Sequence, residues 1–234
     1  ETVTVNLGTE NLTGQISNIT SKNDAEVWVQ EKESNPDFGF DFWRSIYSIS
    51  IKNDGSFGTR LPKGTYRLVV VPAAESKMSS FAMTIGDEFS IGDTAAITNV
   101  SLKTTANVTY TVTPKSIAVG SEVQIMQKVT FTKGEKYFYL LNTKVNADGK
   151  IRVNLPVGKY QFNVFQKSND YAKTSASEIN ISSSSTTVDE TLALETPNLT
   201  VNLSSLVAGS DLSGWISGES SDGTLDFSGG IIDG

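Results

Sequence analysis

The sequence predicts an all-β protein built from tandem antiparallel β-sandwich modules. Three observations lead to this prediction. Hydrophobic residues alternate with polar ones along short segments, the segments are separated by sequences typical of tight turns, and the whole pattern occurs twice within 234 residues. Short alternating segments joined by turns are typical of sandwiches, in which each strand buries one of its two faces.

The alternation is clearest in the segment 66–70. Tyr66, Leu68 and Val70 alternate there with Arg67 and Val69, and residues 26–30 show the same pattern. Every second side chain of a strand points to the same face, whereas the period of a helix is about 3.6 residues. We therefore expect strands, and we find no helical stripe.

Two turn motifs separate the segments of each half. In the first, Asp-Gly, glycine supplies the positive φ of a tight hairpin turn. In the second, Leu-Pro-x-Gly-x-Tyr, proline fixes φ at the corner, glycine lets the chain reverse, and tyrosine begins the next strand with a buried ring and a hydroxyl bonded to nearby backbone. The motif residues are Asp54, Gly55, Pro62, Gly64 and Tyr66 in the first half, and Asp148, Gly149, Pro156, Gly158 and Tyr160 in the second.

The two halves are copies of one repeat. Residues 12–29 align without a gap with residues 108–125, and residues 53–71 align with residues 147–165. Glu26 aligns with Glu122, which is 96 residues further on, whereas Asp54 aligns with Asp148, which is 94 residues further on. The loop between these positions is therefore two residues longer in the first copy.

This alignment divides the chain into four parts. Residues 11–106 and 107–197 are the two full β-sandwich repeats, residues 1–10 resemble the last strand of a preceding repeat or a linker, and residues 198–234 resemble the start of a truncated third repeat. Because the pattern is cut within a repeat at both ends, we expect the chain to be a segment of a longer protein. Incomplete repeats leave strand edges uncovered, so we also expect self-association through the terminal segments.

The segments DGSFGTRLPKGTYRLVVV and DGKIRVNLPVGKYQFNV resemble the core motif of carboxypeptidase regulatory-like (transthyretin-like) β-sandwich repeats. This resemblance implies seven-stranded sandwiches of the prealbumin-like or immunoglobulin-like type, without catalytic residues, in secreted or surface-exposed bacterial proteins. The related collagen-adhesin B-type repeats often form an isopeptide bond from a lysine on the first strand. The corresponding segments 11–16 and 107–112 contain no lysine, so we expect no isopeptide bond here.

Composition excludes several classes of function. The chain has neither Cys nor His, so it can form no disulfide, no Ser-His-Asp triad and no Cys₂His₂ zinc site. Its net charge of −7 disfavours nucleic acid as a partner, and no apolar run reaches the length of about 18 residues typical of a membrane span. The acidic loops around Asp87, Asp93 and Asp222 do not match the calcium-binding D-x-D-x-D-G spacing. We therefore expect no metal, no cofactor and no membrane insertion.

The strongest candidate for a ligand site is the aromatic segment 35–43, which we place in the extended middle loop of the first copy. Aromatic rings beside carboxylates can stack on sugar faces and hydrogen-bond to sugar hydroxyls. The alternative is that the rings cap the end of the sandwich, which the equivalent aromatic run 137–139 of the second copy favours. The candidate ligand-binding residues are Phe38, Phe40, Asp41, Phe42 and Trp43.

Asn-x-Ser/Thr sequons are frequent, and we interpret them as a consequence of a composition rich in Asn, Ser and Thr. Three of them, at Asn11, Asn107 and Asn198, begin a repeated strand motif, so structure alone explains their recurrence.

We expect no catalysis. Glu26 and Glu122 occupy equivalent places in the two copies, which indicates a structural role, and an array of small sandwiches predicts no cleft for a pair of catalytic carboxylates. The leading hypothesis is a stalk, spacer or adhesion module of a larger bacterial secreted or cell-surface protein, for which the absence of Cys is suitable. The alternative is an accessory module of an extracellular hydrolase that binds glycan or assists folding. The expected partner is an extracellular glycan or protein.

Overall fold

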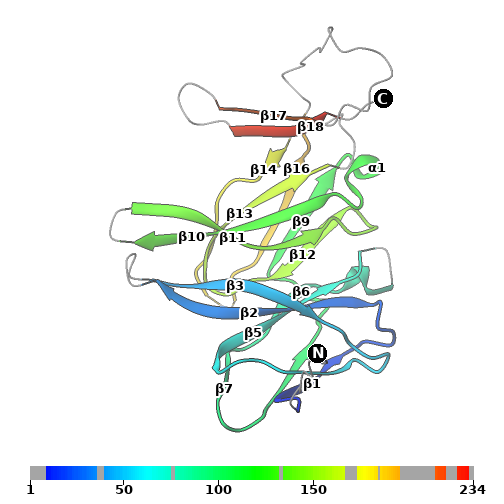
Figure 1. The fold of residues 1–234 in the computed structure, drawn as a ribbon. Helices are drawn as coiled ribbons and strands as arrows, with labels where there is room; N and C mark the ends of the chain where they lie inside the picture. The colour runs from blue at the N-terminus through cyan, green and yellow to red at the C-terminus, as the bar shows by residue number, and fades with distance from the viewer. Residues whose placement is uncertain are drawn as a thin grey trace. The chain divides into compact units, whose positions relative to one another are not determined.

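Figure 1 shows a computed structural model of the chain, which describes residues 9–35, 40–74, 77–131, 134–166, 173–183, 185–195, 214–219 and 226–231. Within these ranges the regular structure is β apart from two helices of a single turn each. The all-β prediction is confirmed.

The strands of the first copy alternate with short turns. They are β1 (Leu12–Ser17), β2 (Ala25–Asn35), β3 (Phe40–Ile49), β4 (Ser56–Thr59), β5 (Gly64–Pro72), β6 (Met83–Ile85), β7 (Phe89–Ile91) and β8 (Ala96–Ser101), with the 3₁₀ helix η1 (Lys77–Ser80) before β6.

The second copy repeats this order. Its elements are β9 (Val108–Thr113), helix α1 (Lys115–Ala118), β10 (Glu122–Phe131), β11 (Gly134–Lys144), β12 (Lys150–Asn154), β13 (Gly158–Phe165), β14 (Thr174–Ser175), β15 (Ile179–Ile181) and β16 (Val188–Ala193).

Each copy is a sandwich of a small and a large sheet. In the first copy the small sheet has the order β4-β1-β8, and the large sheet contains β3, β2, β5 and β6, with β7 beside β5. In the second copy the small sheet is β12-β9-β16 and the large sheet is β11-β10-β13-β14, with β15 beside β13. The small sheet of the second copy continues into the large sheet of the first, because β12 pairs with β6.

The strand pairing is mostly antiparallel, as predicted, but the first and last strands of each copy pair in parallel. β1 pairs with β8 over six residues, from Leu12↔Ala96 to Ser17↔Ser101, and β9 pairs with β16 in the same way. The alternation that identifies a strand in the sequence carries no information about its partner, so this pairing was not predicted.

The registers of the two copies agree in detail. A β-bulge interrupts the β2–β3 pairing between Val29 and Gln30, and another interrupts the β10–β11 pairing at the equivalent place, between Ile125 and Met126. The β2–β3 hairpin closes with Asn35 opposite residue 40, whereas its counterpart closes with residue 131 opposite residue 134. The prediction that the middle loop is two residues longer in the first copy is therefore confirmed.

Each copy has its own hydrophobic core, made by the alternating residues of its two sheets. Leu12, Val27 and Leu68 belong to the first core. Val69 and Met83 lie in the first copy but belong to the second core. They reach it because they point away from their own sandwich, toward the second copy.

The Asp-Gly turns have the predicted conformation. Gly55 and Gly149 have φ angles of 82° and 81°, which L-residues resist. Asp54 Oδ1 accepts a hydrogen bond from the backbone N–H of Ser56 (3.0 Å), and the Asp148 carboxylate accepts the equivalent bond from the second turn (3.2 Å).

The two motif tyrosines also behave as predicted. The exposed fractions of Tyr66 and Tyr160 are 0% and 1%, and each hydroxyl donates to the carbonyl oxygen of the proline four residues earlier, at 3.1 and 3.0 Å. Burial raises the pKa of Tyr160 to about 12. A Cβ at Gly64 would lie 2.9 Å from the Tyr66 hydroxyl oxygen, so this glycine also leaves room for the tyrosine.

The chain divides into two compact units, Glu1–Asn198 and Leu199–Gly234. Both copies lie in the first unit, and the boundary between residues 106 and 107 stays a prediction. In the second unit, β17 (Gly214–Glu219) pairs antiparallel with β18 (Asp226–Ile231). Residues 1–8 and 198–213, on which the predicted terminal repeats depend, lie outside the described residues. Across the described part of the chain, no helix is long and apolar enough to cross a membrane.

Candidate functional site

The aromatic segment 35–43 is divided between a loop and a strand. Phe38 lies outside the described residues, and of Phe40 only the backbone is described, as the first residue of β3. Asp41, Phe42 and Trp43 lie within β3, so their predicted place in a loop was wrong. The reason is that the antiparallel pairing with β2 continues almost to the end of the hairpin.

Asp41 and Trp43 take part in a cluster around Lys32 on β2. The Lys32 ammonium lies 3.4 Å from an oxygen of Asp41 and 3.4 Å from an oxygen of Glu88, which precedes β7. The same ammonium lies 5.9 Å from the ring centroid of Trp43, and the Ser34 hydroxyl donates to Asp41 at 2.5 Å. The hydrogen bond from Ser34 lowers the pKa of Asp41, with a smaller contribution from Lys32.

The second copy contains the same cluster at equivalent positions. Lys128 lies 2.7 Å from Glu135 and 2.9 Å from Glu178, and its ammonium is 5.7 Å from the ring centroid of Tyr137. The Thr130 hydroxyl donates to Glu135 at 3.2 Å, as Ser34 does to Asp41. Because the contacts recur, cohesion of the hairpin with the following strand accounts for Asp41 and Trp43 without a ligand. A ligand role for them stays a prediction.

A buried polar group joins the two copies. Gln30 has an exposed fraction of 0%, and its amide nitrogen donates to the Leu140 carbonyl oxygen of the second copy at 2.8 Å. Its amide oxygen accepts from Arg67 Nε at 2.8 Å, and the Arg67 guanidinium lies 4.1 Å from the ring centroid of Trp43. Burial lowers the pKa of Arg67 to about 10, so the group remains cationic at neutral pH.

A second set of bonds joins the copies beside η1. The Ser79 carbonyl oxygen accepts from Asn146 Nδ2 at 2.6 Å and from Arg152 Nη1 at 3.3 Å. The backbone N–H of Ala147 donates to the Ala74 carbonyl oxygen at 3.1 Å. These contacts, the β6–β12 pairing and the bond from Gln30 to Leu140 join the two copies into one continuous fold. We call this set of contacts the inter-repeat junction.

A groove of about 720 Å³ lies along the inter-repeat junction. Its wall in the first copy includes Glu26 and Trp28 from β2, and its wall in the second copy includes Glu122, Tyr139 and Asn142 from β10 and β11. The expectation that sandwich repeats offer no cleft was therefore wrong. The groove exists because the second copy covers only part of the outer face of the first copy's large sheet. It covers Gln30 and Val69 there but leaves Trp28 36% exposed.

The groove was not predicted from the sequence, although one signal was present. Val27 and Val29 are core residues, so the alternation places Trp28 on the outer face of the same strand. Trp28 and Tyr139 line the same groove, and a group of exposed apolar side chains marks an interaction site more strongly than a single one does. On the second copy, Tyr139 is 48% exposed, and its pKa is raised by burial and by Glu122.

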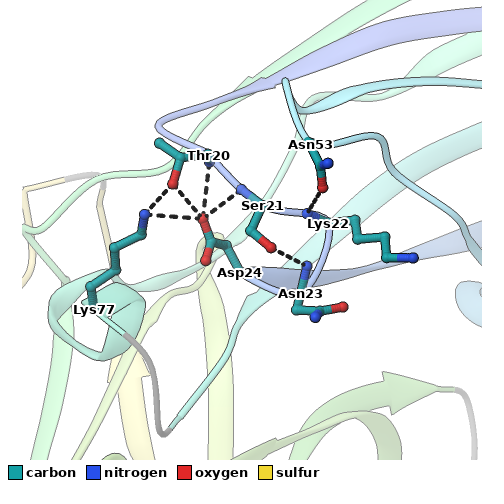
Figure 2. Close-up of polar contacts among 7 residues, drawn as sticks. All are labelled: Thr20, Ser21, Lys22, Asn23, Asp24, Asn53 and Lys77. Carbon is teal, nitrogen blue, oxygen red and sulfur yellow. Dashed lines mark hydrogen bonds and ion pairs between the residues drawn. The ribbon is translucent and has the colours of Figure 1, made fainter.

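The loop before β2, residues 18–24, contributes Lys22 and Asn23 to the lining of the groove. Figure 2 shows the Asp24 carboxylate, which accepts hydrogen bonds from the backbone N–H groups of Thr20 (2.9 Å) and Ser21 (3.0 Å) and lies 3.7 Å from the Lys77 ammonium. The bond from the Thr20 backbone is the main cause that lowers the pKa of Asp24. The backbone N–H of Lys22 donates to Asn53 Oδ1 at 3.1 Å. These bonds fix the loop from which Lys22 lines the groove.

In the part of the chain that the structure describes, few observations support metal binding or catalysis. Among those residues no three carboxylates gather into a group that could hold a metal ion. Asp222 lies outside them. In the groove, Glu122 accepts a hydrogen bond from Asn142, and Glu26 accepts one from Trp28 Nε1 at 3.3 Å. The lysines of the described ranges are all at least partly exposed, so none is buried as an isopeptide lysine would be.

No family model and no curated protein matches the sequence. Among solved structures, the chain is similar to the Bacillus anthracis TIE protein, with 14% identity and a TM-score of 0.31 over 80% of this chain. That match covers 34% of the TIE chain, so this chain spans about a third of its length.

Two pilins are also similar. The shaft pilin SpaA from Lactobacillus rhamnosus GG is 9% identical, with a TM-score of 0.28 over 81% of this chain and 98% of that one. A streptococcal ancillary pilin is 13% identical, with a TM-score of 0.31 over 79% of this chain and 68% of that one. These are distant likenesses.

Proposed function

We propose that the two repeats form a non-catalytic, load-bearing spacer in a bacterial secreted or cell-surface protein. The Asp-Gly and Leu-Pro-x-Gly-x-Tyr motifs support the finer assignment to carboxypeptidase regulatory-like repeats, whose modules occur in such proteins. The observation that carries the proposal is the parallel pairing of the first and last strands of each repeat.

Parallel pairing matters because of the direction in which a stalk is pulled. Tension along the chain draws β1 toward its Leu12 end and β8 toward its Ser101 end, and these ends lie at opposite ends of the paired segment. The two strands must then slide past each other, so their hydrogen bonds are loaded together. An antiparallel hairpin pulled from its two open ends would instead lose its bonds one at a time. β9 and β16 present the same geometry in the second repeat.

The inter-repeat junction supports a spacer in a second way. A stalk keeps its reach only if its modules do not fold back on one another, and flexible linkers allow such bending. In this chain the connection between the two repeats is reinforced by the β6–β12 pairing, by Val69 and Met83 in the second core, and by the bond from Gln30 to Leu140. The predicted lack of enzymatic activity also remains part of this proposal, since the chain has neither His nor Cys.

Single-molecule pulling of the full chain tests the proposal. Force applied through the two termini loads β1 against β8 in shear. Force applied through the N-terminus and a cysteine introduced by Arg60→Cys peels β1 from β4, because Leu12 lies opposite Thr59 in that antiparallel pair. The natural chain has no Cys, so the attachment is unique. We expect a clearly higher unfolding force for the terminal geometry. Equal forces in the two geometries would overturn the load-bearing role.

A further inference from the structure

The groove along the inter-repeat junction presents two exposed aromatic rings among polar side chains. Trp28 and Tyr139 are 36% and 48% exposed, and both line the groove. A volume of about 720 Å³ lies in the range of small-molecule sites, about 300–1,000 Å³. The bonds of the junction use other side chains, so the rings are not needed to hold the repeats together.

We propose that this groove binds an uncharged oligosaccharide, with Trp28 and Tyr139 as stacking surfaces for sugar rings. This inference goes beyond the spacer role and does not rest on it. It also assigns a site different from the aromatic segment 35–43, because none of those residues lines the groove.

The polar groups of the groove suit hydroxyl ligands. Glu26 and Glu122 supply acceptors, and Asn142 supplies an amide that both donates and accepts. A sugar hydroxyl also donates and accepts, so it can bond to each of these groups. Trp28 Nε1 donates to Glu26, which holds the indole beside the carboxylate. An aromatic surface with a few placed polar groups is the usual composition of a ligand site.

The charge of the groove favours an uncharged ligand. Lys22 and Lys144 line it together with Glu26 and Glu122, so its formal charges cancel. A polyanion or a polycation would gain no net attraction there.

The groove is also held in shape before a ligand binds. Gln30 lies in its wall, and its amide is fixed by Arg67 and Leu140. The Asp24 contacts in Figure 2 fix the loop that carries Lys22. A fixed site loses less conformational entropy on binding, which raises affinity.

Isothermal titration of the full chain with cellohexaose, xylohexaose, mannohexaose and hexa-N-acetylchitohexaose tests the proposal. We expect one or more of these neutral probes to bind, and Trp28→Ala and Tyr139→Ala each to weaken that binding by about tenfold or more, as loss of an aromatic anchor does. Ile97→Ala is the matched control, because Ile97 is 77% exposed and lies outside the groove. It should bind as the natural chain does. Both aromatic residues are exposed, and thermal unfolding verifies that their variants fold.

Three results would overturn the proposal. They are the absence of binding to all four probes, binding that survives both aromatic substitutions, and preferential binding of an oligogalacturonate or of an unstructured peptide pool used as competitors. None of these results bears on the unfolding force. The ligand proposal can therefore be wrong while the load-bearing proposal stands, and the reverse also holds.

Discussion

Replacing Asn107 by Ala tests whether the asparagine at the start of each repeat holds the repeat closed. Asn107 Nδ2 donates to the Leu155 carbonyl oxygen at 2.8 Å, and the Leu155 N–H donates to Asn107 Oδ1 at 2.9 Å. Leu155 is 4% exposed, so alanine would leave one backbone donor and one acceptor without partners. Each such group costs about 1–3 kcal/mol, and water can reach the site because Asn107 is only half-buried. We therefore expect a loss of about 2–3 kcal/mol in the free energy of unfolding.

Urea denaturation and thermal unfolding measure this loss. For a unit of this size, 2–3 kcal/mol corresponds to a fall of about 5–10 °C in Tm. Asn11 makes the same pair of bonds to Leu61, at 2.8 Å each, so Asn11→Ala should cost a similar amount. Asn180→Ala is the control, because Asn180 also begins a sequon but is exposed, and it should leave stability unchanged.

If Asn107→Ala cost no more than Asn180→Ala, Asn107 would not hold the repeat closed. A loss in Asn107→Ala without a comparable loss in Asn11→Ala would refute the equivalence of the two repeats.

Two other predictions concern single polar contacts. Tyr160→Phe removes the hydroxyl that donates to Pro156 and should lower the free energy of unfolding by about 1 kcal/mol. Tyr160→Ala also removes the buried ring and should lower it by about 3–5 kcal/mol. Equal losses in urea denaturation would show that the hydroxyl, not the ring, dominates. The pKa of Asp24 is lowered below 3.8 in the folded chain, so its carboxylate stabilises the fold above that pH and this contribution is lost as the pH falls through the folded-state pKa. Unfolding measured from neutral pH to about pH 2 should show a smaller acid loss in Asp24→Asn; identical acid profiles would contradict this reading.

Local features could be predicted because they depend on neighbours in the sequence. The positive φ of Gly55 follows from the Asp-Gly turn, and the burial of Tyr66 follows from its place at the start of an alternating segment. The different length of the middle loop follows from the alignment of the copies alone. In each case the determining residues lie within a few positions of one another.

Features that depend on distant partners could not be predicted. Gln30 and Arg67 are outward residues on their strands, and nothing in the sequence says that the second copy covers them while leaving Trp28 exposed. The parallel pairing of β1 with β8 has the same origin, since alternation identifies strands and not their neighbours. The sequence places Asn11 at the start of a repeated strand motif, but only the fold shows that its amide bonds to Leu61, which is 50 residues away.

We infer that the inter-repeat junction holds the two repeats in one fixed arrangement, and pulsed electron paramagnetic resonance tests this most directly. Spin labels at Ile97→Cys and Val157→Cys place one probe on each repeat, at positions that are 77% and 61% exposed in a chain without natural Cys. Labels at Lys52→Cys and Ile97→Cys, both in the first repeat, give the reference width. We predict a single distance distribution between the repeats as narrow as this reference, and a broader one when Gln30→Ala is added. A broad distribution in the chain with Gln30 intact would contradict the claim, because it would show two repeats that move independently.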